Sequence, residues 1–236
     1  GCCDRLPRMS AAHEIAVTTR GVDISFGTGE TKVTALNQTE FTARRGELIM
    51  LVGPSGCGKT TLLSVIAGTL TPQAGAVEVF GQRLDKMNQE QLTAFRRKHL
   101  GFVFQSFNLI PTLSVIENVM VPLLIQGVSH SEERRRSLLI LEKVGLKGRE
   151  DGKPNALSGG QQQRVAIARA LVRNADIVLL DEPLMNLDYK LREQLREEFK
   201  DLFSSTASSV VLYSTTEPSE AMLLGDEVLV LHEGKI

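Results

Sequence analysis

The sequence contains few residues that could form disulfide bonds. Three of its 236 residues are cysteines, of which Cys2 and Cys3 are adjacent and Cys57 is far from both. This pattern is no disulfide framework, and it favours a protein of the reducing cytosol. No apolar run approaches the roughly 18 residues of a transmembrane helix, and the first residues lack the apolar core of a signal peptide. We expect no membrane span, and we assign no function to residues 1–8, which precede the first methionine.

A large net charge of either sign is also missing. The chain carries 27 Lys or Arg against 28 Asp or Glu, so its formal net charge is −1. This balance does not indicate a nucleic-acid surface, and we expect no nucleic-acid partner. The basic run Arg134–Arg136 directly follows Glu132 and Glu133, which is typical of a solvated helix face. The length and the 42% hydrophobic content allow one domain with a full core and an inserted lobe.

The stretch Gly53–Thr60 fits the pattern G-x-x-x-x-G-K-[ST] of a phosphate-binding P-loop. Glycines let the backbone approach a polyphosphate closely, so that its N–H groups can surround the anion. Lys59 would then reach the β- and γ-phosphates, and the Thr60 hydroxyl can ligate Mg²⁺. The flanks fit this interpretation, because the apolar run 48–52 predicts a buried parallel strand and 61–67 predicts a helix.

Strands are predicted before the P-loop, and helices dominate after it. Residues 15–24 alternate loosely and predict an edge strand or two, and 33–43 predicts a further hairpin, so an antiparallel β-layer precedes the P-loop. We interpret 85–155 as a helical lobe inserted between core strands. Phe26 is a lone aromatic beside glycines, and it could stack on an adenine ring or lie at the edge of the core.

Two later stretches are further candidates for the chemistry. Leu157–Gln161 opens a helix with Ser158 as a natural N-cap, and its glycines expose N–H groups to an anion. Asp181 and Glu182 follow the apolar strand 177–180. In a protein with a P-loop, acidic residues at the carboxyl end of a buried strand are expected beside the Mg²⁺. Apolar residues then recur every four positions and predict one amphipathic helix: Leu187, Leu191, Leu195 and Phe199.

In this order, the P-loop, the run Leu-Ser-Gly-Gly-Gln and an apolar strand ending in Asp-Glu-Pro resemble the ATP-binding-cassette ATPases of membrane transporters. The resemblance covers the chain from about Val22 to Ile236. It implies an α/β fold, a P-loop NTPase (RecA-like) core with an antiparallel β-layer and an inserted α-helical subdomain. The chain would be a single nucleotide-binding domain, with 1–84 and 156–236 as the ATPase core and 85–155 as the helical subdomain.

The resemblance also implies roles for single residues. Phe26 matches the aromatic that stacks on adenine. Asp181 matches the carboxylate that supports Mg²⁺, and Glu182 matches the general base that activates water. Gln105 matches the glutamine that contacts Mg²⁺ or the attacking water and senses the transmembrane partner, and Lys59 stabilises charge during catalysis. The P-loop residues implied in nucleotide binding are Gly53, Ser55, Gly56, Cys57, Gly58, Lys59, Thr60 and Thr61.

The run Ser158, Gly159, Gly160 and Gln161 is similar to the signature that, in this family, binds the γ-phosphate of a nucleotide held by the opposite subunit. Two chains would therefore hold two ATP molecules head to tail, and Asp188 matches the aspartate that couples the two sites. The resemblance implies ATP and Mg²⁺ as cofactors. It implies a second nucleotide-binding subunit, in a homodimer, and permease subunits as partners. It also implies a peripheral location at the cytoplasmic face of the inner membrane.

One position departs from the family pattern. Most such ATPases have a histidine after the next strand, in a run like V-T-H-D, whereas Thr216 stands at that place here. The histidine normally contacts the γ-phosphate and orients Glu182 and water, and threonine is shorter and carries no charge. The sequence therefore predicts ATP binding and leaves two alternatives, a hydrolysing ATPase and an ATP-binding switch with little hydrolysis.

The resemblance is divided between two classes of transporter. Residues 22–180 look most like the ATPases of lipoprotein release and macrolide efflux, and 181–236 look more like those of sugar and glycerol importers. We predict a transporter ATPase of the export or efflux type, with an importer as the alternative and a hybrid or truncated chain as a further interpretation. A soluble cassette ATPase of DNA repair or translation fits less well, because about 100 residues separate the two phosphate motifs and there is one cassette.

Overall fold

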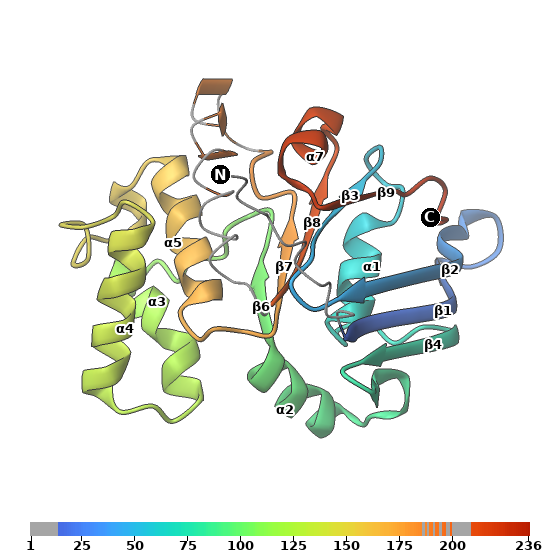
Figure 1. Cartoon of the computed structure of the whole chain (residues 1–236), viewed down its shortest axis with the longest axis horizontal. Coiled ribbons are helices and arrows are strands. Elements are labelled where there is room, and N and C mark those ends of the chain that lie inside the picture. Colours follow the sequence, from blue (N-terminus) through green and yellow to red (C-terminus); the bar gives the residue numbers. More distant parts are fainter. Residues whose placement is uncertain are drawn as a thin grey trace, which may run out of the picture.

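The computed structural model describes residues 14–185 and 209–236 and, between these ranges, residues 187, 189, 190, 192, 193, 195, 196 and 199. Within this part of the chain, five parallel strands form a central sheet in the order β6-β7-β8-β3-β9, and four antiparallel strands form a second sheet in the order β2-β1-β4-β5 (Figure 1). The strands are β1 Ile15–Phe26, β2 Val33–Arg44, β3 Leu48–Val52, β4 Ala74–Val79, β5 Gln82–Arg83, β6 Leu100–Val103, β7 Ile177–Asp181, β8 Val210–Thr215 and β9 Glu227–Val230. The α-helices are α1 Lys59–Ile66, α2 Gln89–His99, α3 Val115–Ile125, α4 His130–Lys143, α5 Gly159–Leu171 and α7 Pro218–Leu224.

The antiparallel layer before the P-loop contains one long hairpin, β1 paired with β2, and its strand order differs from the prediction. The loose alternation of 15–24 predicted an edge strand, but β1 is an inner strand with β2 on one side and β4 on the other. The expected separate hairpin at 33–43 is the single strand β2. The edge prediction was wrong because the partner on the second side, β4, comes from beyond the P-loop helix.

Three inner strands of the central sheet, β3, β7 and β8, are buried on both faces, whereas the edge strand β9 is largely exposed. In β3, Ile49 and Leu51 belong to a core with α1 and the antiparallel sheet, whereas Met50 and Val52 belong to a core with α5 and α7. The same division holds in β7 and β8, which explains why 177–180 and 210–212 are apolar. In Figure 1, α1 and α5 accordingly lie on opposite sides of the central strands.

The helices α3, α4 and α5 pack around a third core beside the central sheet (Figure 1). The range 85–155 was expected to be a helical lobe. It is only partly helical, and it is not separate from the central sheet, because it contains β6, which pairs with β7. The helices that build the third core begin at α3. Of the predicted amphipathic helix, Leu187, Leu195 and Phe199 are buried against the sheet, and Leu191 lies outside the described residues. None of the helices in the described part of the chain is long and apolar enough to span a bilayer.

Candidate functional site

The P-loop joins the end of β3 to the start of α1, and its glycines adopt conformations that other residues avoid. Gly56 has φ of 81° and Gly58, the residue before α1, has φ of 110°. A side chain on Gly58 would collide with the backbone carbonyl of Ala35 in β2, and one on Gly53 would collide with the carbonyl of Leu231. The loop is thus confined between β2 and the residues after β9, and only glycine fits where it makes contact.

Lys59 is buried at the centre of the loop. It is 4% exposed, and its Nζ donates hydrogen bonds to the carbonyl oxygens of Gly53 at 2.8 Å and Pro54 at 3.0 Å. The same Nζ lies 3.3 Å from Oε1 of Glu182, which follows β7. The sheet therefore brings the P-loop cation and the predicted general base into direct contact, and a phosphate entering the loop must compete with these partners for the ammonium group.

Thr60 and Asp181 also meet between the P-loop helix and β7. The Thr60 hydroxyl lies 3.0 and 2.9 Å from the two carboxylate oxygens of Asp181, which is 6% exposed. Oxygen ligands of this kind, one hydroxyl and one carboxylate, are those that Mg²⁺ prefers beside a nucleotide. The donor set of these two residues therefore fits Mg²⁺.

Ser214 in β8 joins the two acidic residues, and the sequence analysis did not identify it. Asp181 and Ser214 are partners in the parallel register of β7 and β8. The Ser214 hydroxyl donates to Oδ1 of Asp181 at 2.8 Å, and it accepts the backbone N–H of Glu182 at 3.0 Å. The only sequence signal was a polar residue near the carboxyl end of an apolar strand, next to the predicted acidic pair.

Thr216, at the expected histidine position, follows β8 and is half-buried. It lines a cavity of about 230 Å³ together with Glu182, and the other lining residues are Leu184, Met185, Arg192, Thr215, Glu217 and Glu220. Gln105, which follows β6, donates from its side-chain amide to Sδ of Met185 at 3.0 Å. Thr216 and Glu182 therefore share one cavity, and Gln105 contacts a residue of its wall.

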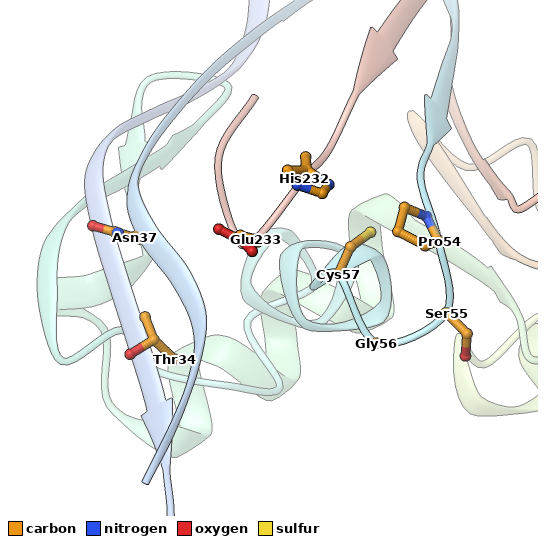
Figure 2. A pocket seen from close by; sticks show the side chains of 8 residues that line it. All are labelled: Thr34, Asn37, Pro54, Ser55, Gly56, Cys57, His232 and Glu233. Atoms are coloured by element: carbon orange, nitrogen blue, oxygen red, sulfur yellow. The ribbon is translucent and has the colours of Figure 1, made fainter.

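A larger cavity of about 460 Å³ lies on another side of the P-loop (Figure 2). The P-loop residues 54–57 form one wall, and Thr34 and Asn37 of β2 form another. His232 and Glu233 complete the lining, and the turn that carries them is held to the loop because the Gly234 N–H donates to the Cys57 carbonyl at 3.1 Å. The sequence analysis missed these four residues, since they come from segments with no motif of their own.

The signature run lies at the start of α5. Ser158 is the N-cap, its hydroxyl accepting the Gln161 N–H at 3.3 Å, while the Gln161 side chain accepts the Ser158 N–H at 3.1 Å. Ser158 and Gly159 are exposed, and Gly160 is buried. The helices α1 and α5 cover opposite faces of the central sheet. The signature run therefore lies apart from the P-loop residues of its own chain.

Three further predicted residues lie apart from this cluster. Phe26 is 47% exposed at the end of β1 and is not among the residues that line the two cavities. Thr61, in the first turn of α1, is half-buried. Asp188 lies outside the described residues, so its predicted role stays a prediction.

Comparison with known proteins agrees with this architecture. The sequence profile of the family described as "ABC transporter" matches residues 36–185. The lipoprotein-releasing system ATP-binding protein LolD of Chromohalobacter salexigens is 40% identical over 96% of this chain and 94% of its own length. The Fe(3+) ions import ATP-binding protein FbpC of Pasteurella multocida is 40% identical over 87% of this chain and 57% of its own length.

A solved structure shares the fold. The ATP-binding cassette MJ0796, determined as a dimer in a post-hydrolysis state with ADP and Pi, superposes with a TM-score of 0.84. It is 37% identical in sequence, and the match covers 93% of this chain and 96% of that one. The P-loop ATPase fold with parallel and antiparallel sheets is therefore confirmed.

The sheet order, the P-loop with its acidic partners, and these matches together define the class of protein: the chain belongs to the ABC transporter family. Within this family it is an ATP-binding subunit and an ATPase. The resemblance recognised in the sequence is thereby confirmed.

Proposed function

We propose that the chain binds ATP with Mg²⁺ and hydrolyses it to drive transport through a partner permease. The observation that carries this proposal is the contact of Lys59, Thr60, Asp181 and Glu182 at the ends of β3 and β7. These groups are the parts that phosphoryl transfer needs, a cation for the phosphates, oxygen ligands for a metal, and a carboxylate base. Gln105 and Thr216 would complete the set from the adjoining loops.

In this mechanism, Lys59 is the residue that would bind the phosphates. Its ammonium group contacts the carbonyls of Gly53 and Pro54 and the carboxylate of Glu182, and it would exchange these partners for the β- and γ-phosphates. Glu182 is then free to accept a proton from the attacking water. Mg²⁺, held by Thr60 and Asp181, would neutralise charge on the phosphates.

A second copy of the chain would complete each site. The exposed start of α5, with Ser158 and Gly159, lies on the other side of the central sheet from α1, which supports binding of the signature to a nucleotide on another subunit. The cassette MJ0796 was determined as a dimer, which supports the same assembly. We propose a head-to-tail homodimer, in which Phe26 stacks on adenine and Asp188 couples the sites. It would bind a permease at the cytoplasmic face of the inner membrane.

The proposed type of transport is export or lipoprotein release. The relative named for lipoprotein release spans nearly the full length of both chains. Import is the second candidate, because a relative named for Fe(3+) import is also 40% identical. Purification with the permease encoded beside the gene, followed by transport assays with lipoprotein and with small solutes, separates the two types.

Steady-state hydrolysis of Mg-ATP by the purified protein tests the enzymatic part. We expect the parent to turn over and Glu182→Gln to abolish turnover while ATP still binds, since the amide cannot accept a proton. Thr216→His should not be needed for activity. If the parent binds ATP without turnover and Thr216→His restores it, the chain is an ATP-binding switch, and the proposal of hydrolysis is wrong.

A further inference from the structure

Ser214 forms hydrogen bonds to both acidic residues of the site, Asp181 and Glu182. Its side chain is completely buried in β8. The hydroxyl donates to Oδ1 of Asp181 at 2.8 Å and accepts the Glu182 N–H at 3.0 Å, so one group contacts both the predicted metal ligand and the backbone of the predicted base. A serine hydroxyl can donate and accept at once, and an apolar residue of similar size can do neither.

The backbone of Glu182 needs such a support. Its φ is 44°, in the left-handed region that residues with a side chain rarely adopt. A backbone of this kind persists only where its surroundings hold it in place. Here the Glu182 N–H points at two acceptors of one residue, the carbonyl oxygen of Ser214 at 3.1 Å and its hydroxyl at 3.0 Å. The carboxylate of Glu182 lies 3.3 Å from Nζ of Lys59.

Thr216 does not provide this support. It lines the cavity beside Glu182, but no hydrogen bond of its hydroxyl is present among the described residues. In the run V-T-H-D, to which 214–217 corresponds, the place of Ser214 is taken by valine, which has no hydrogen-bonding group. The bonds from the side chain of Ser214 to Asp181 and Glu182 are therefore a feature of this chain rather than of that pattern.

We propose that Ser214 is a positioning residue for ATP hydrolysis, which holds Asp181 and the strained backbone of Glu182 in their working positions. The inference rests on the proposed role of Glu182 as the base. Ser214 would act through these two residues and would not contact the nucleotide. Its loss should consequently lower kcat and leave the affinity for ATP nearly unchanged, because the P-loop and Lys59 stay in place.

The test uses the matched pair Ser214→Thr and Ser214→Val. The two side chains have the same shape, and only threonine keeps the hydroxyl, so their difference isolates the hydrogen bonds. We expect kcat of Ser214→Val to be about tenfold below that of Ser214→Thr, the scale of one hydrogen bond expressed at the transition state. The KM for ATP and the binding of a fluorescent ATP analogue should agree within about twofold. The nucleotide-free Ser214→Val protein should also unfold at a lower temperature than Ser214→Thr.

Thr19→Val is the control for losing a buried hydroxyl elsewhere. Thr19 is 1% exposed in β1, and its hydroxyl donates to the Thr39 carbonyl at 3.3 Å. We expect this variant to lose some thermal stability and to keep the kcat of the parent. A fall of kcat in this control equal to that of Ser214→Val would show a general effect of destabilisation and would overturn the proposal.

Three other outcomes also decide against it. If the parent and Ser214→Thr turn over, Glu182→Gln is silent, and Ser214→Val has the kcat of Ser214→Thr, the positioning role is refuted while the proposed function stands. If Ser214→Val raises KM and keeps kcat, Ser214 acts in binding and the inference is wrong. A parent without turnover refutes the proposed function itself, and the inference with it.

Discussion

Replacing Glu220 by alanine should destabilise the protein strongly, because this carboxylate is buried and accepts hydrogen bonds from three side chains. Glu220 is 3% exposed at the first turn of α7. Its Oε2 accepts the hydroxyls of Thr215 at 2.6 Å and Tyr213 at 3.3 Å, and its Oε1 accepts the Arg196 guanidinium at 3.4 Å. Burial and the neighbouring carboxylate raise the pKa of Tyr213, so its hydroxyl stays protonated and remains a donor.

The expected loss of stability follows from the buried donors that lose their acceptor. Glu220→Ala deprives a buried guanidinium and the Tyr213 hydroxyl of this acceptor, and removing one partner of a buried ion pair costs about 3–5 kcal/mol. A chain of this length loses about 2–4 °C of Tm per kcal/mol, so a fall of about 10 °C is expected. Glu220→Gln keeps the shape and an acceptor oxygen for Thr215, and should cost about 1–2 kcal/mol.

Urea denaturation and thermal unfolding of the purified variants measure these differences. Tyr213→Phe is the matched control, since it deletes a single long hydrogen bond of Glu220 and should cost less than about 1 kcal/mol. The expected order of loss is alanine, then glutamine, then the Tyr213 control. A loss below about 1 kcal/mol for Glu220→Ala would mean that the carboxylate is not the centre of a buried network, and the reasoning would fail.

Two further predictions concern the signature and the pH dependence of stability. Ser158→Ala removes an N-cap and should cost about 1 kcal/mol of stability together with most ATPase activity, whereas Ser114→Ala, which removes the equivalent cap of α3, should cost similar stability and spare activity. The hydrogen bond from Arg83 lowers the pKa of Asp85 from 3.8 to about 2, so this carboxylate adds stability above pH 3.8 that is lost as the pH falls toward 2. Asp85→Asn should therefore lower the free energy of unfolding by about 1 kcal/mol at pH 7, a value reduced for solvent screening, and denaturation curves should converge near pH 2.

The strands β3 and β7 of the central sheet were predictable because they are buried on both faces. The runs 48–52 and 177–180 are apolar throughout, and a continuous apolar run bounded by turns indicates a buried strand whatever its neighbours are. The place of β1 was not predictable in this way. An inner and an outer strand of an antiparallel layer can show the same alternation, and β4 joins β1 from beyond the P-loop. The strand β6 lies inside 85–155, and its place in the central sheet depends on pairing with β7.

The candidate site was predictable where its residues are consecutive. The P-loop and the pair Asp181 and Glu182 each form a motif that can be read along the chain, and the structure brings them into contact. Ser214 and His232 carry no such motif. Ser214 reaches Asp181 through the register of β7 and β8, and His232 reaches the P-loop through the turn after β9, so both depend on strand order.

The position of the signature relative to the P-loop leads to a prediction about protein concentration. In one chain α1 packs on one face of the central sheet and α5 on the other, so the sheet itself separates Lys59 from Ser158. A site that needs both segments then forms only when two chains meet, and the fraction of complete sites rises with concentration. Specific ATPase activity should therefore increase as the purified protein is concentrated, and mixing inactive Lys59→Ala with inactive Ser158→Ala should restore part of the turnover. An activity that is independent of concentration down to the monomeric range, measured beside sedimentation velocity, would show that one chain suffices.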